Sequence, residues 1–226
     1  MNEGELLKDG RNFIKVLDAP DGQRLNVKRY HVPSGPNRLV YSLGIRKPKG
    51  QRAYEYPQIL LSRGIETPEN IAYIEDRHLG MLGFSYFVCT QCDYGHELYE
   101  VGHAPDGTYN ELAIALARFT AHMHENNVMH RDYSPGNILW KKDGQGYHFS
   151  VIDINRMYFG PVDIRMGCAN FSRLWGPKHF IELLVCEYAG LRGFDETAAV
   201  NIAMASRAHF WKRFLKKHTV SFDVEL

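Results

Sequence analysis

The stretch from Val128 to Trp140 constrains the fold of this chain more than any other part of the sequence. It reads V-M-H-R-D-Y-S-P-G-N-I-L-W and places Asn137 five residues after Asp132. The preceding segment, Tyr109 to Asn126, is rich in alanine and leucine at helical spacing and predicts an amphipathic helix. The following segments I-L-W and Y-H-F-S-V-I-D flank K-K-D-G-Q-G and predict a hairpin. The polar stretch is therefore either a plain turn between apolar elements or a functional loop.

The first third of the chain is rich in short strand patterns. Asn12 to Leu17 and Arg24 to Tyr30 flank D-A-P-D-G-Q, which predicts a hairpin. A second hairpin is predicted where I-A-Y-I-E and G-F-S-Y-F-V-C-T flank D-R-H-L-G. Between the hairpins, Lys49 to Arg63 has broadly helical spacing. Because an interior proline removes a helix hydrogen bond, Pro57 predicts a kink or a later start of this helix.

The pattern changes at Thr108, after which helices dominate. Besides the helix at Tyr109 to Asn126, we predict helices at about 177–190 and 196–217. The fold class that follows is α+β with two lobes. A small β-rich N-lobe with one helix covers residues 1–95, and a mainly helical C-lobe covers residues 96–226, with the boundary near Asp93 to Pro105.

Composition excludes several classes of function. The 226 residues are 44% hydrophobic, enough for a substantial core. Lys and Arg total 27 against 26 Asp and Glu, so no bulk attraction to nucleic acid or to a membrane is encoded. The sequence shows neither an apolar run of about 18 residues nor a cationic and apolar leader. We therefore expect a cytoplasmic protein without nucleic-acid partners.

The four cysteines do not form a disulfide framework in a chain of this size. Cys89 and Cys92 have C-x-x-C spacing, which can serve zinc binding or redox chemistry. No second pair of Cys or His at matching spacing completes four ligands. We interpret both residues as small side chains at the end of a buried strand.

The polar stretch has the residue types that phosphoryl transfer requires, namely a positioned nucleophile, neutralised phosphate charge and held metal ions. In H-R-D-x-x-x-x-N, Asp132 would accept or orient a hydroxyl proton, and Asn137 would bind Mg²⁺. His130 and Arg131 would brace the loop. Four fixed residues at these offsets arise by chance with a probability on the order of one in a thousand. The pattern therefore favours a catalytic loop.

A second acidic residue, Asp153 in V-I-D-I-N, follows the predicted hairpin and would bind Mg²⁺ together with Asn137 through oxygen ligands. Upstream, the same chemistry needs a strand lysine on the α- and β-phosphates and a helix glutamate that pairs with it. Lys28 is the candidate lysine, with Lys15 and Arg29 as alternatives, and Glu55 is the candidate glutamate. Taken singly, each of these residues is interpreted as a surface charge or part of a surface salt bridge. Their order along the chain, strand lysine, helix glutamate, H-R-D loop and Asp153, favours a role in phosphoryl transfer.

Together these motifs resemble the protein-kinase-like superfamily, and more narrowly the bacterial lipopolysaccharide kinases that phosphorylate Kdo or heptose of the inner core. The narrower resemblance rests on N-V-K-R-Y-H-V-P, R-A-Y-E-Y, G-I-E-T-P-E-N-I-A-Y-I-E, H-R-D-Y-S-P-G-N-I-L and D-I-N-R-M, and runs across about three-quarters of the chain. It implies an ATP- and Mg²⁺-dependent kinase acting on a sugar hydroxyl of the lipopolysaccharide core, with peripheral contact at the cytoplasmic face of the inner membrane.

The resemblance also implies where nucleotide binds. ATP would lie between the lobes along the segment from Phe87 to Tyr94, which offers Gln91 and Asp93. In place of a G-x-G-x-x-G loop the chain has only L-K-D-G-R-N, whose Gly10 would let backbone amides approach phosphate, with Lys8 or Arg11 adding charge.

Two further departures bear on the acceptor. D-I-N stands where D-F-G is usual, and no A-P-E follows. The segment from Arg156 to Arg173 is short for a peptide platform, which favours a sugar. Its basic side chains would contact anionic groups of the acceptor: Arg156, Arg165 and Arg173. The aromatic side chains in and next to this segment either stack on sugar rings or pack in the core: Tyr158, Phe159 and Trp175. A nucleotide-binding scaffold without activity and a protein kinase remain as alternatives.

Overall fold

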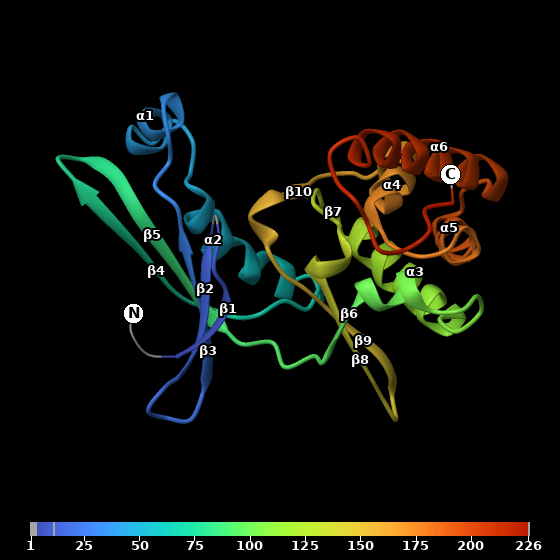
Figure 1. The fold of residues 1–226 in the computed structure, drawn as a ribbon, viewed down its shortest axis with the longest axis horizontal. Helices are drawn as coiled ribbons and strands as arrows, with labels where there is room; N and C mark the ends of the chain where they lie inside the picture. Colours follow the sequence, from blue (N-terminus) through green and yellow to red (C-terminus); the bar gives the residue numbers. More distant parts are fainter. Residues whose placement is uncertain (1–3, 11, 226) are drawn as a thin grey trace. The chain divides into compact units, whose positions relative to one another are not determined.

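The computed structural model describes residues 4–10 and 12–225 and divides into two compact units (Figure 1). The first runs up to Asp93 and includes Asp153–Asn155, and the second comprises Tyr94–Ile152 and the chain from Arg156 onward. The division expected from sequence places Asp153–Asn155 with the C-terminal part instead. Arg11, a predicted phosphate contact, lies outside the described residues.

The first unit is built on a five-stranded antiparallel sheet with strand order β1-β2-β3-β5-β4. Its strands are β1 Glu5–Lys8, β2 Phe13–Asp18, β3 Arg24–Tyr30, β4 Asn70–His78 and β5 Met81–Thr90. Both predicted hairpins are confirmed. The β2–β3 turn forms because Gly22 adopts φ +84° and the Asp21 carboxylate accepts the Gln23 amide at 3.0 Å.

Two helices accompany this sheet, α1 Pro36–Ser42 and α2 Lys49–Leu61. Helix α1 was not predicted, although Pro36 occupies the first helical position, where proline is favourable. The later start predicted for α2 is wrong, because the helix begins at Lys49 and contains Pro57 in its interior. Pro57 is buried, so the burial of its ring offsets part of the lost backbone hydrogen bond.

Helix α2 is attached to the sheet by a small apolar cluster. Ala53 of α2 packs with Tyr30 of β3 and with Phe87 and Cys89 of β5, all buried. Cys92 follows the strand, and the structure shows no disulfide bond at either of these two described cysteines. Burial raises the pKa of the Cys89 thiol to about 12, so the C-x-x-C pair contributes a small apolar side chain at Cys89 rather than a thiolate.

The second unit is mainly helical and carries two small sheets, one of β7 and β10 and one of β6, β8 and β9. Its strands are β6 His96–Glu97, β7 Val128–His130, β8 Ile138–Asp143, β9 Gly146–Val151 and β10 Met157–Phe159. Its helices are α3 Asn110–Glu125, α4 Ile164–Asn170, α5 Lys178–Arg192 and α6 Glu196–Phe214, with 3₁₀ turns at Leu98–His103, Pro135–Asn137 and Phe171–Arg173. A further 3₁₀ turn, Ile154–Arg156, begins in the first unit and ends in the second. The predicted helices at 109–126, 177–190 and 196–217 and the β8–β9 hairpin are confirmed; α4 was not predicted.

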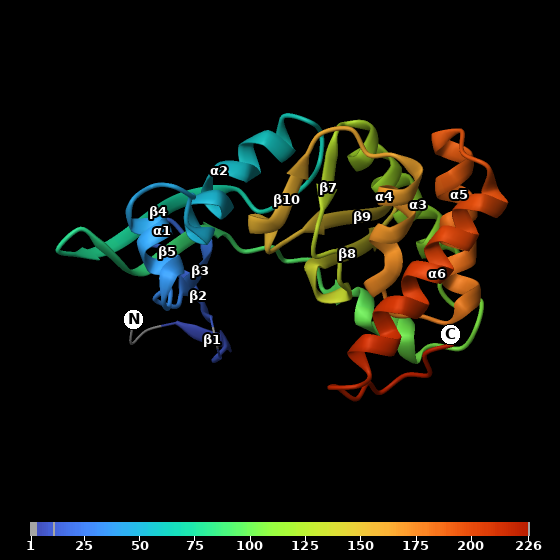
Figure 2. The same cartoon turned by 90° about the horizontal axis from the view of Figure 1, so that it is seen from above.

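Helix α3 is the centre of this unit because one of its faces is fully buried. Leu112, Leu116 and Met123 are inaccessible to solvent, and α3 packs along α5. Helix α6 packs on α4 and on the turn Phe171–Arg173, as both views show (Figures 1 and 2). In the described part of the chain, no helix combines the length and apolar character needed to span a lipid bilayer.

Candidate active site

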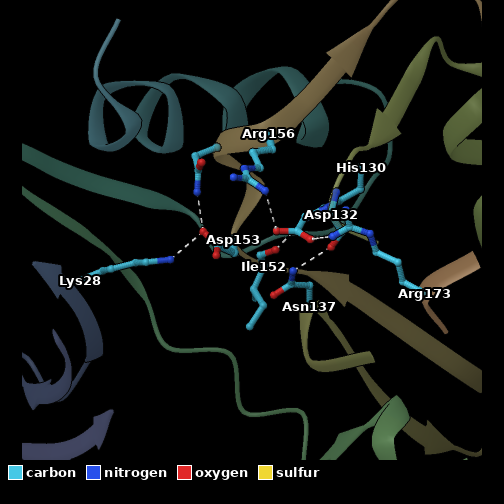
Figure 3. A network of polar contacts seen from close by, with 9 residues as sticks. Lys28, His130, Asp132, Asn137, Ile152, Asp153, Arg156 and Arg173 are labelled. Carbon is cyan, nitrogen blue, oxygen red and sulfur yellow. Dashed lines mark hydrogen bonds and ion pairs between the residues drawn. The ribbon is translucent and has the colours of Figure 1, made fainter. Parts of the chain in front are cut away.

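The first unit brings Lys28 and Asp153 together. The Lys28 ammonium lies 2.6 Å from Asp153 Oδ1, and the side-chain amide of Asn155 donates to the same oxygen at 2.5 Å (Figure 3). The Lys28 side chain is only 12% exposed, whereas that of Asp153 is 34% exposed. The ion pair therefore lies at the edge of the packed interior, with the carboxylate on the side that solvent reaches.

The backbone of Asp153 is strained. Its φ angle is +54°, in the left-handed region that residues with a Cβ rarely occupy. Such a conformation costs on the order of 1–3 kcal/mol and is found most often where function requires a particular side-chain direction. In this chain the carboxylate pairs with Lys28, two residues after strand β9 ends at Val151.

Lys28 is held in place by the register of its sheet. On β3 it lies opposite Ile14 of β2 and Phe87 of β5, and its ammonium lies 5.3 Å from the centre of the Tyr30 ring. Burial, followed by the charge of Asp153, raises the pKa of Tyr30 well above its usual value. Tyr30 is thus a neutral aromatic neighbour of the ion pair.

The predicted ion pair between Lys28 and Glu55 is not formed. Glu55 instead accepts from Lys47 at 2.7 Å and from Gln51, one turn earlier on α2, at 3.0 Å. Lys28 is engaged by Asp153, and a helix partner four residues away costs Glu55 less side-chain order than a strand partner would. The strand lysine was identified by its motif, whereas its partner was assigned from residue type alone.

The second unit contains the H-R-D loop, and His130 is its internal brace. His130 is fully buried; its Nδ1 accepts the backbone N–H of Asp132 at 3.1 Å, and its Nε2 lies 2.9 Å from the Ile152 carbonyl (Figure 3). Since Nδ1 is an acceptor, the proton is on Nε2, which donates to Ile152. The same ring fixes Asp132 and the residue just before Asp153.

The carboxylate of Asp132 is held by two arginines. Its Oδ2 pairs with Arg156 at 3.3 Å, and its Oδ1 pairs with Arg173 (Figure 3). The Asp132 backbone carbonyl accepts the side-chain amide of Asn137 at 2.8 Å, which fixes that amide so that its Oδ1 is the atom available as a ligand. Asp132 is 26% exposed, so a hydroxyl group in solution can reach it.

Packing around the loop explains two more of its residues. Tyr133 is fully buried. Its hydroxyl donates to Thr120 Oγ1 at 2.8 Å, and the Thr120 hydroxyl in turn donates to the Leu116 carbonyl of α3. A Cβ at Gly136 would lie 2.8 Å from the Tyr99 ring, so any other residue there would require that ring to move. Motif reading treats both positions as variable, but the fold restricts them.

A chain of hydrogen-bonded polar side chains supports the H-R-D loop, and no motif in the sequence indicates it. Asn170 donates to the His130 carbonyl at 3.0 Å and accepts from His124 Nε2 at 3.3 Å. The other ring nitrogen of His124, Nδ1, lies 2.9 Å from the Tyr188 hydroxyl. Arg192 donates to the same hydroxyl at 2.9 Å. Burial lowers the pKa of His124 to about 3, so the ring is neutral and can accept from Tyr188. The four side chains come from three helices, α3, α4 and α5.

The remaining predicted residues have local contacts. The Arg131 guanidinium lies 5.2 Å from the Tyr158 ring centre, which ties the loop to β10. Gln91 accepts from Asn26 at 2.8 Å, and Asp93 pairs with Arg24 at 3.2 Å. Gly10 follows β1, and among the residues that the structure describes, apart from its chain neighbours, a Cβ there would meet no atom within 4 Å. Its position thus carries no steric demand for glycine.

The fold places the chain in the class of protein-kinase-like α+β proteins. A solved structure described as "WaaP in complex with acyl carrier protein" matches with a TM-score of 0.60 at 16% identity, covering 96% of this chain and 90% of that one. The family model described as "Lipopolysaccharide kinase (Kdo/WaaP) family" matches residues 27–174. The chain therefore belongs to the lipopolysaccharide kinase (Kdo/WaaP) family, and the resemblance stated from its motifs is confirmed.

The chain also resembles two mammalian proteins in sequence. The "Inhibitor of nuclear factor kappa-B kinase subunit beta" of Bos taurus is 24% identical over 164 residues, and that of Mus musculus is 23% identical over the same length. Each match covers 71% of this chain and 20% of the relative. The chain thus spans about a fifth of the length of these relatives.

Proposed function

We propose that the protein is an ATP-dependent kinase that phosphorylates a sugar hydroxyl of the lipopolysaccharide inner core, on Kdo or on heptose. Family membership supports the class of reaction. The observation that carries the proposal is the state of Asp132, a partly exposed carboxylate whose backbone is fixed by His130 and Asn137. A general base needs this combination of access and fixed direction.

The residues of the first unit suit the nucleotide. Lys28 supplies a positive charge for the α- and β-phosphates, and Asp153 and Asn137 supply the carboxylate and amide oxygens that Mg²⁺ prefers. When bound, Mg²⁺ neutralises phosphate charge. The proposal assigns Gly10, Gln91 and Asp93 to the surroundings of ATP, and Glu55 to the support of α2 rather than of Lys28.

The chemical step then uses the residues of the second unit. The acceptor hydroxyl gives its proton to Asp132 while its oxygen bonds to the γ-phosphorus, and the bond from that phosphorus to the β,γ-bridging oxygen breaks to release ADP. His130 and Arg131 hold the loop during this step. Turnover therefore depends on both units, and nucleotide binding depends on the Lys28 and Asp153 pair.

The proposed acceptor fixes the setting of the reaction. A core sugar attached to lipid is met at the cytoplasmic face of the inner membrane, so we propose peripheral contact with that membrane and no nucleic-acid partner. A scaffold that binds nucleotide without turnover is the rival function, and the departure at Gly10 and D-I-N favours it.

The test is thermal stability with ATP and Mg²⁺, alone and together, for wild type, Asp153→Ala and the exposed control Asp163→Ala, followed by assay of phosphate transfer to a deacylated inner-core oligosaccharide. We expect a Mg²⁺-dependent shift and transfer in wild type and the control, and neither in Asp153→Ala. A shift without transfer to any core sugar would favour the scaffold. The absence of both from wild type would contradict the proposal.

A further inference from the structure

A basic groove opens on the second unit, next to the catalytic loop. It lies between α6 on one side and α4 with the turn Phe171–Arg173 on the other, with a volume of about 750 Å³. This volume falls within the range of about 300–1,000 Å³ that is common for small-ligand sites. Two of its lining residues, Ala169 of α4 and Ala205 of α6, have small side chains.

The charge of the groove has one sign. Arg173, Arg213 and Lys217 line it together with His209 and His218, and none of the eleven described lining residues is Asp or Glu. In the described part of the chain, Arg213 and Lys217 take part in no ion pair. A set of cations without carboxylates is suited to bind carboxylate or phosphate groups of a ligand.

Aromatic rings form the wall along α6. Phe210, Phe214 and His218 follow one another at four-residue spacing, with ring centres 5.5 Å apart for the first pair and 4.4 Å for the second. Both pairs are stacked, so Phe210 and Phe214 form an apolar strip that the His218 ring continues beyond the end of α6. The apolar face of a sugar ring packs on such a strip while its acidic substituents reach the arginines.

Arg173 connects the groove with the site of chemistry. Its guanidinium lies 5.3 Å from the Phe210 ring centre and also pairs with Oδ1 of Asp132 (Figure 3). The loop that follows is fixed by buried Arg207 of α6, which donates to the Leu174 and Gly176 carbonyls at 2.6 and 2.8 Å. A ligand anion in the groove thus competes with Asp132 for Arg173.

We propose that this groove binds the acceptor through carboxylate or phosphate groups of an anionic core saccharide, and that engagement of Arg173 by the acceptor frees Asp132 for the hydroxyl proton. The proposal rests on the function proposed above and names the part of the acceptor that is recognised. It makes Arg213 and Lys217 specificity-determining residues and Arg173 a positioning residue. A neutral sugar would be a poor acceptor because it would leave Arg173 on Asp132.

The test compares two double variants with equal loss of charge. Arg213→Ala/Lys217→Ala removes the groove cations, and Lys212→Ala/Lys216→Ala removes exposed neighbours that do not line the groove. Binding of a deacylated, Kdo-containing inner-core oligosaccharide is measured by calorimetry without ATP. We expect Kd to rise at least tenfold in the groove variant and less than twofold in the control, with equal stabilisation of all three proteins by Mg²⁺ and ATP.

Kinetics add a second reading. In the groove variant, KM for the oligosaccharide should rise, while kcat stays within a factor of two of the wild-type value. Arg173→Gln should change both KM and kcat. Repeating the binding with an enzymatically dephosphorylated oligosaccharide identifies the anion: lost binding assigns phosphate and retained binding assigns carboxylate, and either agrees with the proposal.

Three results would overturn the groove assignment. The first is equal affinity of all three proteins for the oligosaccharide, and the second is no affinity of the wild type for it. The third is a groove variant that loses affinity for an acidic acyl carrier protein but keeps its affinity for the oligosaccharide. Failure of the proposed function is distinguishable. Oligosaccharide binding at the groove without phosphate transfer would support the groove assignment and contradict the proposed kinase activity. Phosphate transfer that the groove variant leaves unchanged would support the kinase activity and contradict the groove assignment.

Discussion

The two carboxylates of the candidate site lie in different kinds of surroundings. Asp153, in the first unit, pairs with one lysine and a neighbouring asparagine and holds a strained backbone angle of +54°. Asp132, in the second unit, pairs with two arginines, and its backbone is fixed by buried His130 and by Asn137. One is positioned by local backbone strain, and the other by a network that extends through the unit.

This difference indicates a division of labour. Asp153, which directly precedes the 3₁₀ turn Ile154–Arg156, carries the kind of oxygen ligand that Mg²⁺ prefers and has one lysine as its charged partner. A carboxylate on a braced loop keeps its direction while its arginine partners move. The comparison predicts that changes around Asp153 act on nucleotide binding and that changes around Asp132 act on turnover or on stability.

The largest expected effect separates the two carboxylates directly. Asp132→Asn should lower kcat by about 10²–10⁴-fold because the amide cannot accept the hydroxyl proton. Stabilisation by Mg²⁺ and ATP should stay near the wild-type value, whereas Asp153→Asn should lose it. Steady-state kinetics and thermal shift on the two variants check this. Turnover of Asp132→Asn within tenfold of wild type would remove the base role.

The brace behind Asp132 is tested by stability. His130→Ala leaves the Asp132 N–H and the Ile152 carbonyl without their buried partner, and should lower the free energy of unfolding by about 2–4 kcal/mol. The measurement is urea unfolding, with exposed His179→Ala as the control, expected to change stability by less than about 0.5 kcal/mol. Equal midpoints for both variants would show that the loop does not need its brace.

The polar chain behind the loop should make stability depend on pH. The pKa of His124 is about 3 in the folded protein, and an unfolded histidine titrates near its usual 6.5, so between these values only the unfolded state takes up the proton. Unfolding free energy therefore falls as pH falls below 6.5. Between pH 7.5 and 5 this single group contributes a loss of about 2 kcal/mol.

Replacement of the ring isolates that contribution. His124→Gln should be less stable at pH 7.5, yet its loss on going to pH 5 should be smaller than that of wild type by about 2 kcal/mol. Unfolding by urea at several pH values provides the comparison. Parallel pH profiles for the two proteins would mean that His124 is not the residue responsible.

The smallest effect sharpens the comparison within the first unit. Glu55→Gln removes a partly exposed pair with Lys47, so stability should change by less than about 1 kcal/mol and kcat by less than threefold. Lys28→Met should abolish the shift with Mg²⁺ and ATP. A loss of kcat in Glu55→Gln comparable to that of Lys28→Met would restore Glu55 as the functional partner of Lys28.

Periodicity and motif spacing in the sequence predict many of the local elements of the molecule. The helix that became α3, the two N-terminal hairpins and the β8–β9 hairpin are local features, set by spacing and by turn residues such as Gly22. The H-R-D loop was recognisable because its residues are close in sequence, and it also carried the family resemblance. Short elements with weak periodicity, α1 and α4, were missed.

What the sequence by itself determined is thus the set of local elements, the order of motifs and the family. Only the tertiary structure decided partners: that Lys28 binds Asp153 rather than Glu55, that Asn170 and His124 support the loop, and that Arg213 lies beside Phe210 in a groove leading to Asp132. The physical reason is range. Backbone propensities and turn chemistry act over a few residues, whereas ion pairs and buried hydrogen bonds join residues that only packing of the folded chain brings together.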